Sequence, residues 1–326
     1  MGESGDYSVT VTVPIYNSSR FIDDCLRYIS EQTYDIFEVI FVVDERTTDG
    51  SEQLLKEKAK TLGNVRVVTQ SDVEGLAGAR NIGIRESKGD VIWFLDVDDI
   101  PHPTFLEELV RVMKETDADT VLCNNFQTFE REMPNIPEKD YSYKVVDGIY
   151  AVEHYTDYPI YSWSRIQKRS VFDEESMFRS RPAAEDIEQT IRQYAASEKV
   201  CYYNKPLYAY VKSKRTASLS NRSKELESLE LIAGSILPFV KEKMPENYPG
   251  FEKTFLLNMM RQSTFSKYRD YKKWYLSSCC RSLVKNAAEK TTEMKIFSSF
   301  KMLYYLVLFP FSHYLWDRKK GLWDKS

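Results

Sequence analysis

Histidine and cysteine are scarce in this chain of 326 residues, which contains three histidines and five cysteines. The cysteines are odd in number and scattered, and no C-x-x-C pair occurs among them. Neither a disulfide framework nor a zinc site is therefore expected, and a reducing, cytoplasmic compartment is favoured. The histidines are too few for a histidine-rich metal centre, so carboxylates are the groups left to carry chemistry.

Basic residues are not in excess either, because 45 lysines and arginines stand against 49 aspartates and glutamates, for a net charge of −4. Nucleic acid is not an expected partner, since its binding requires a positive field that displaces counterions from phosphates. The hydrophobic share of 42% and the charged share of 29% are typical of a folded globular protein. The length predicts about two domains.

No apolar run in the sequence is long enough to span a bilayer. Residues 302–316, the apolar segment near the C-terminus, would form a helix of about 22 Å, whereas the hydrocarbon core is about 30 Å thick. Aromatic residues within this segment and basic residues on both sides suit a helix in the headgroup region. We therefore expect residues 295–320 to bind an anionic membrane surface at the inner face of the cell membrane. A buried terminal helix or a homo-oligomer contact is the alternative.

Short apolar runs alternate with helical patterns along the first 125 residues. Such runs predict an α/β fold, in which strands of a mostly parallel sheet are buried between helices. The predicted strands are residues 8–14, 37–44, 65–69, 90–96 and 120–123. Ligands of parallel sheets bind beyond the carboxyl ends of the strands. The polar residues at those ends are the candidates: Asn17, Asp44, Asp96 and Asp98.

The rest of the chain has other patterns. Residues 126–221 mix proline and tyrosine with β-like runs at 142–150 and 200–210, and a helix is predicted to begin near residues 182–186. From residue 222 onward the periodicity is that of long helices.

Four segments of the first region form a specific set when they are taken in order. They are VPIYN (13–17), VDERTTDGS (43–51), GLAGARNIG (75–83) and FLDVDD (94–99). Together they resemble glycosyltransferase family 2, whose members have the GT-A fold and use nucleotide-diphosphate sugars. The resemblance is strong over residues 8–125 and weaker to about residue 220.

The resemblance implies an organisation for the whole chain. Residues 1–125 would be the nucleotide-sugar-binding half of a GT-A domain, and residues 126–221 the acceptor-binding and catalytic half. Residues 222–326 would be a helical C-terminal region that includes the membrane-interface helix.

Asp96 and Asp98 carry the strongest chemical signal. Alternation along a strand would place both carboxylates on one side, where they would resist ionisation unless a cation lay between them. Mg²⁺ or Mn²⁺ fits, because hard divalent ions accept carboxylate and diphosphate oxygens together. The resemblance makes Asp98 the metal ligand and places Asp96 near the ribose or base. The alternative is that both acids cap the following helix.

The other donor contacts follow from the resemblance, which assigns Pro14, Tyr16 and Asn17 to the nucleotide-sugar site. Asp44 would accept hydrogen bonds from the nucleobase. The family usually has two aspartates followed by Gly-Ser here, whereas this chain reads DERT at residues 44–47, which leaves the nucleotide open. Alternatively, Asp44 or Asp49 caps the next helix.

Arg80 lies in a glycine-rich entry to a helix, where the helix start favours anions. The dinucleotide-binding pattern G-x-G-x-x-G is absent. The resemblance implies that Arg80 contacts the nucleotide or its phosphates, and a surface salt bridge is the alternative. Residues 212–218 resemble the basic loop that closes over the diphosphate, with Arg215 as the neutralising cation; a solvated basic loop is the alternative.

The second region contains PAAEDIE (182–188), which resembles the Glu-Asp pair of the family. Asp186 would be the general base that an inverting transfer needs, with Glu185 as its orienting partner. The alternative is that these acids only stabilise a helix start through the dipole.

We therefore expect a metal-dependent, inverting glycosyltransferase. It would move a sugar from a nucleotide-diphosphate donor, UDP-linked, to a hydroxyl of a glycan or lipid-linked acceptor in the synthesis of cell-surface polysaccharides or glycoconjugates. One alternative is a non-catalytic module that binds sugar nucleotides. Another is a phosphohydrolase, because DVDDI (96–100) approaches the D-x-D-x-T/V motif, with Ile100 in the place of Thr or Val.

Overall fold

The computed structural model describes residues 6–71, 74–181, 185–212 and 222–264. The chain forms two compact units, Met1–Ser218 and Leu219–Ser326. The predicted membrane-binding segment at 295–320 and Arg215 lie outside the described residues. No helix within the described ranges has the length and apolar character needed to cross a membrane.

The first unit is built on a sheet of nine strands with the order β3-β2-β1-β4-β8-β6-β9-β5, in which β7 also pairs with β9. The first four strands are parallel to one another: β1 (Val9–Ile15), β2 (Glu38–Asp44), β3 (Val65–Gln70) and β4 (Val91–Phe94). Every residue of β2 is buried, because helices cover both faces of this part of the sheet. The predicted strands of this region are confirmed.

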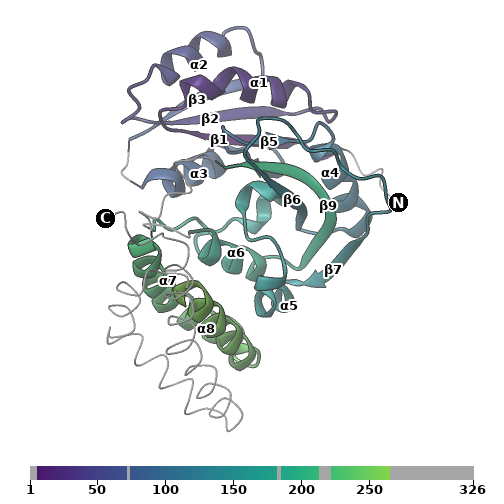
Figure 1. Ribbon diagram of the computed structural model, residues 1–326, viewed down its shortest axis with the longest axis vertical. Helices are drawn as coiled ribbons and strands as arrows, with labels where there is room; N and C mark the ends of the chain where they lie inside the picture. The colour runs from purple at the N-terminus through teal and green to yellow at the C-terminus, as the bar shows by residue number, and fades with distance from the viewer. Residues whose placement is uncertain (1–5, 72–73, 182–184, 213–221, 265–326) are drawn as a thin grey trace, which may run out of the picture. The chain divides into compact units, whose positions relative to one another are not determined.

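The helices that connect these strands lie on opposite faces, as Figure 1 shows for α1 and α2 on one side and α3 on the other. They are α1 (Ile22–Ser30), α2 (Ser51–Ala59) and α3 (Gly75–Glu86), with the 3₁₀ turn η1 (Ser19–Phe21) before α1. Because the chain changes faces after β3, the crossovers diverge between β1 and β4. A crevice at the carboxyl end of the sheet is expected at such a switch point.

The remaining strands make the sheet mixed rather than mostly parallel. β8 (Arg165–Lys168) is antiparallel to both β4 and β6 (Thr120–Thr128), which it separates. β9 (Lys199–Val211) is parallel to β6, and both β5 (Ile100–Pro101) and β7 (Tyr143–Asp147) run antiparallel to it. The sequence did not indicate this mixture, because β8 is only four residues long and has no apolar run.

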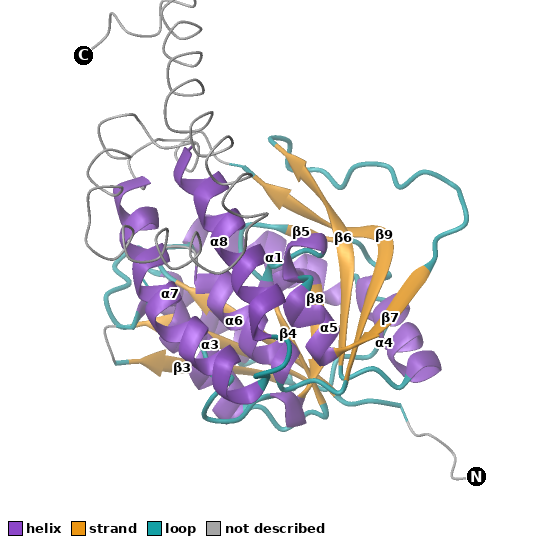
Figure 2. Cartoon of the chain, turned by 90° about the horizontal axis from the view of Figure 1, so that it is seen from below, coloured by secondary structure: helices purple, strands orange, loops and turns teal. Residues whose placement is uncertain are grey.

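The other helices of the first unit flank this second half of the sheet. They are α4 (Phe105–Thr116), α5 (Gly148–Glu153), α6 (Glu185–Ala195) and the 3₁₀ turns η2 (Tyr155–Asp157), η3 (Ser162–Ser164) and η4 (Arg169–Val171). Figures 1 and 2 both show α3 and α6 as neighbours. The second unit contains α7 (Arg222–Lys243) and α8 (Tyr248–Thr264).

One aromatic core joins the two halves of the first unit. Trp93 of β4 stacks on Phe105 of α4 with ring centroids 4.6 Å apart, and its indole N–H donates to the carbonyl of Trp163. Trp163 in turn stacks on Tyr208 of β9 at 4.4 Å. These rings are buried, so they contribute to the hydrophobic core.

Candidate active site

A pocket of about 480 Å³ lies at the carboxyl ends of β1, β2 and β4, at the switch point of the sheet. It brings together six of the residues predicted to contact the donor: Pro14, Tyr16, Asn17, Asp44, Asp96 and Asp98. They meet there because parallel strands end at one edge of a sheet. The volume is in the usual range for a small-ligand pocket, which is about 300–1,000 Å³.

The turn after β1 supplies two of these residues. Tyr16 presents an exposed ring to the pocket, with 58% of the residue accessible. Asn17 has a positive φ of 47°, a conformation that asparagine tolerates better than most residues. Its side-chain oxygen accepts a hydrogen bond of 2.9 Å from the Thr48 amide. The turns after β1 and β2 are therefore tied to each other.

Asp44 ends β2 inside the pocket wall and is engaged by Arg46. Its Oδ1 accepts hydrogen bonds from the Arg46 amide at 2.9 Å and from Arg46 Nε at 2.7 Å, and its Oδ2 pairs with the guanidinium. Arg46 thereby lowers the pKa of the Asp44 carboxyl. Neither Asp44 nor Asp49 is the cap residue of α2, which is Gly50, although Asp49 Oδ1 accepts a hydrogen bond of 3.1 Å from the Ser51 amide.

Asp96 and Asp98 do not lie within a strand, so the predicted alternation is wrong for them. β4 ends at Phe94, and the following residues turn away into the pocket. The turn still brings both acids to one site. Burial raises the pKa of each carboxyl, and the charge of Asp98 raises that of Asp96 further. The helix-capping alternative is excluded, since the residue before α4 is Thr104.

Arg80 is buried and lies behind the pocket wall. The alternative, that Arg80 forms a surface salt bridge, is therefore excluded. Its guanidinium pairs with Asp96 at 3.2 Å and with Asp186 at 3.3 Å, and 1% of its side chain is exposed. Burial opposes its charge, but the two carboxylates raise its pKa above the ordinary value. Arg80 thus connects the donor pocket to the predicted base across 106 residues of sequence.

Asp186 lies in the first turn of α6 and keeps 22% of its side chain exposed. Its Oδ1 accepts a hydrogen bond of 2.8 Å from the Ser162 hydroxyl in addition to the Arg80 contact. Ser162 was not foreseen, because a lone serine in an irregular segment carries no sequence signal. Burial, together with the charge of Asp186, raises the pKa of Glu185.

A second arginine, Arg165, is fully buried behind this arrangement and fixes the rotation of α6. It donates to Thr190 Oγ1 at 2.8 Å and to Gln193 Oε1 at 2.7 Å. Asp186, Thr190 and Gln193 are spaced four and three residues apart, so they share one face of the helix. Arg165 therefore holds the face that presents Asp186.

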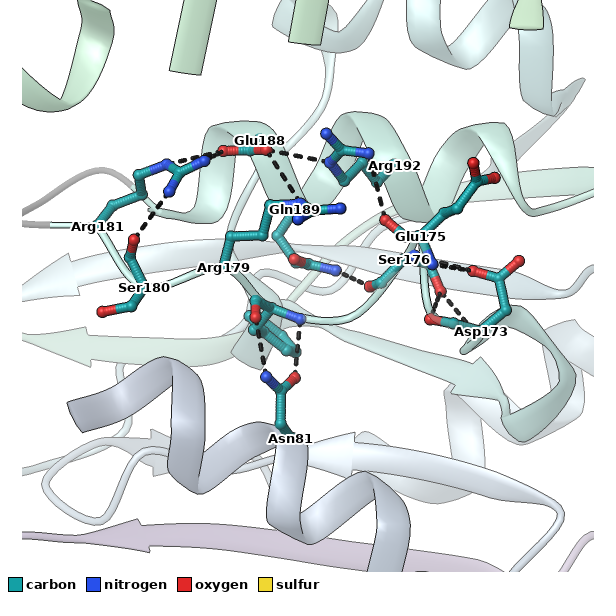
Figure 3. A network of polar contacts seen from close by, with 11 residues as sticks. Asn81, Asp173, Glu175, Ser176, Arg179, Ser180, Arg181, Glu188, Gln189 and Arg192 are labelled. Carbon is teal, nitrogen blue, oxygen red and sulfur yellow. Dashed lines mark hydrogen bonds and ion pairs between the residues drawn. The ribbon is translucent and has the colours of Figure 1, made fainter. Parts of the chain in front are cut away.

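Residues 176–181, ahead of α6, are also held in place, as Figure 3 shows. The amide of Asn81 on α3 makes two hydrogen bonds of 2.8 Å with the backbone N–H and C=O of Phe178. Glu188 of α6 is buried and pairs with Arg181 at 2.6 Å and with Arg192 at 3.1 Å. Since Arg80 and Asn81 are adjacent, α3 reaches both Asp186 and the loop in front of it.

The acidic pair fits a divalent cation in its donor chemistry. The raised pKa of both carboxyls reflects a cost of ionisation that a nearby cation would offset. Arg80 pairs with Asp96, whereas the Asp98 carboxyl is stabilised only in part, by its own backbone amide and by the charges of Arg131 and Arg20. Within the described ranges, no three acidic, histidine or cysteine side chains are arranged to hold a metal by themselves. Mg²⁺ and Mn²⁺ commonly take one or two carboxylates and complete their shell with substrate phosphates and water.

Comparisons with known proteins show the family and the fold. The model of the glycosyl transferase family 2 matches residues 10–178. Glycosyltransferase GlyA of Streptococcus pneumoniae is 31% identical over 215 residues, which are 63% of this chain and 30% of GlyA. The chain thus spans less than a third of the length of that relative.

Two solved structures share the fold. Staphylococcus aureus TarS, in complex with UDP-GlcNAc, matches with a TM-score of 0.59 and 18% identity, over 85% of this chain and 89% of that one. The mannosyltransferase PcManGT from Pyrobaculum calidifontis, in complex with GDP-Man and Mn²⁺, matches with a TM-score of 0.57 and 17% identity, over 99% and 89%. The predicted GT-A fold is thereby confirmed.

Proposed function

The chain belongs to glycosyltransferase family 2, and on that premise we propose that it transfers a sugar, with inversion, from a nucleotide-diphosphate donor to a hydroxyl of a glycan or lipid-linked acceptor. One observation carries the proposal: buried Arg80 pairs with both Asp96 in the donor pocket and Asp186 beside it. Arg80 thus holds Asp96, the acid proposed to contact the donor, and Asp186, the candidate base, on either side of one guanidinium.

The donor would lie in the pocket with its nucleobase near Tyr16 and Asp44, its ribose near Asp96 and its diphosphate near Asp98. UDP is the proposed nucleotide, since the TarS structure holds UDP-GlcNAc. Asp98, with Asp96 beside it, would hold Mn²⁺ or Mg²⁺, which when bound neutralises charge on the departing diphosphate. Arg215, outside the described residues, is proposed to add positive charge to that group.

Asp186 would remove the proton from the acceptor hydroxyl. The hydroxyl oxygen forms a bond to the anomeric carbon while the bond from that carbon to the diphosphate oxygen breaks on the opposite face. Ser162 and Arg80 orient the Asp186 carboxylate before the acceptor arrives. Glu185, next to it, is proposed to be the orienting partner of Asp186.

The surroundings of Asp96 do not favour a phosphohydrolase. An aspartyl-phosphate mechanism requires a free aspartate as nucleophile, and the pairing of Asp96 with buried Arg80 opposes its attack on phosphate. The non-catalytic alternative predicts that the protein binds the sugar-nucleotide donor without forming product. Detection of a transferred sugar would therefore exclude it.

Thermal denaturation with UDP-glucose, UDP-GlcNAc and GDP-mannose, each with and without Mn²⁺, tests donor binding. A ligand at about 100 times its Kd stabilises the native state by about 2.7 kcal/mol, which raises Tm by on the order of 5–10 °C. We expect such a rise for one donor with Mn²⁺ and a smaller rise after addition of a chelator. UMP, which lacks the diphosphate, is the control. If no donor raises Tm under any condition, the proposed function is wrong.

We also propose that residues 295–320 bind an anionic membrane surface, because basic residues flank an apolar, aromatic segment there. The full chain should float with liposomes that contain phosphatidylserine, and added salt should weaken flotation. Replacement of Arg318, Lys319 and Lys320 by glutamine should reduce it. Equal flotation of this variant, or of the wild type with neutral liposomes, would contradict an electrostatic attachment.

A further inference from the structure

The donor pocket contains a cation where the family usually has Gly-Ser after its two aspartates. Arg46 lines the pocket beside Asp44, and 48% of its side chain is exposed. We propose that Arg46, rather than Asp44, reads the edge of the nucleobase, and that it selects donors whose base carries a carbonyl oxygen there. This inference rests on the proposed function and names the chemistry of the donor.

Asp44 has little capacity left to receive a base. Its two oxygens accept the Arg46 amide N–H, the Arg46 Nε–H and a terminal guanidinium N–H. Only 6% of the Asp44 side chain is exposed. An N–H group of an incoming base would therefore meet a carboxylate that is already bonded and neutralised.

Arg46 has N–H groups that are not bonded to Asp44. A guanidinium carries five N–H groups, and those bonded to Asp44 are Nε–H and one terminal N–H. The remaining N–H groups have no acceptor among the described residues, so they are available to a ligand. The pocket wall at this point therefore donates hydrogen bonds instead of accepting them.

Tyr16 places a flat surface beside this donor group. The guanidinium carbon lies 5.9 Å from the centre of the Tyr16 ring, and both residues line the pocket. A planar base that packs against Tyr16 comes within reach of Arg46 with its polar edge. The pair thus combines ring contact with hydrogen-bond donation, as arginine does when it reads guanine O6 and N7.

The chemistry of the bases then divides the donors into two classes. Uracil and guanine carry carbonyl oxygens O4 and O6, whereas cytosine and adenine carry amino groups at the same positions. An amino group facing Arg46 would place two hydrogen-bond donors against each other, with no acceptor between them. One good arginine contact to a base is worth about 1–3 kcal/mol, which is a preference of about 5-fold to 150-fold.

Calorimetric titration of the full chain with UDP, GDP, CDP and ADP in the presence of Mn²⁺ tests the inference. UDP or GDP should bind about 5-fold to 150-fold more tightly than CDP and ADP. In Arg46→Ala this ratio should fall to about one, since the freed Asp44 carboxylate can then accept the ring N–H of uracil or guanine as well as the amino group of cytosine or adenine. Arg46→Lys, which keeps the charge but not the fork, should retain only part of the ratio.

Arg20→Ala is the matched control, because Arg20 is another exposed arginine of the same pocket. Its loss should weaken the binding of all four nucleotides by similar factors and leave the ratio of their Kd values unchanged. An unchanged ratio in Arg46→Ala, or no preference in the wild type, would overturn this inference alone. Failure of all four nucleotides to bind would overturn the proposed function, and this inference with it.

Discussion

Asp98→Ala should reduce sugar transfer by about 10²–10⁴-fold, because the variant loses the carboxylate proposed to hold the cation at the leaving diphosphate. Asp98 lines the donor pocket, and burial raises the pKa of its carboxyl. The fold should tolerate the change, since removal of this carboxylate also removes a cost of ionisation in a buried site. Initial rates with a saturating donor and Mn²⁺ measure the effect.

A second measurement separates loss of the cation from general damage. The rise in Tm that Mn²⁺ adds to donor binding should disappear in Asp98→Ala, while the Tm of the free protein should not fall. Asp35→Ala, at an exposed acid outside the pocket, should keep both the rate and the Mn²⁺ response. A wild-type rate and a full Mn²⁺ response in Asp98→Ala would remove Asp98 from the proposed site.

Asp186→Asn should lower kcat by about 10²–10⁴-fold, the usual contribution of a general base. Asparagine is nearly isosteric and can still accept the Ser162 hydrogen bond, but it cannot take the proton of the acceptor. Asp186 does not line the donor pocket, so the Kd of the donor should change little. Single-turnover rates and donor titrations together measure this separation.

Asp157→Asn is a suitable control, because Asp157 is largely exposed and its carboxylate pairs with His154. It should transfer sugar at the wild-type rate. Ser162→Ala should lower kcat less than Asp186→Asn, since Arg80 still holds the carboxylate. The base assignment fails if Asp186→Asn turns over like the wild type, or if its main defect is weaker donor binding.

Much of the donor half could be predicted because its signals are local. Continuous apolar runs indicate strands buried on both faces, and β2 is buried along its whole length. Asp44, Asp96 and Asp98 follow such runs, and the ends of neighbouring parallel strands meet at one edge. Their assembly in one pocket follows from that geometry, even though Asp96 and Asp98 lie in a turn instead of a strand.

The second half was less predictable because its order depends on pairing between distant segments. β8 enters between β4 and β6 with only four residues, too few for a periodic pattern. Its position is set by the partners on both sides and by the core around Trp163. Arg165, at the start of β8, can be buried because neutral acceptors on α6 bind its guanidinium. No local sequence pattern indicates these contacts.

The sequence by itself determined the strands of the parallel half, the acids at their ends and the family, since burial periodicity and motif order are properties of neighbouring residues. The tertiary structure decided that Arg80 lies between Asp96 and Asp186. It also decided that the Ser162 hydroxyl orients Asp186 and that Arg46 forms hydrogen bonds with the Asp44 carboxylate. These contacts join side chains across loops and, for Arg80 and Asp186, across 106 residues. They depend on the path of the whole chain and on the packing of α3 beside α6.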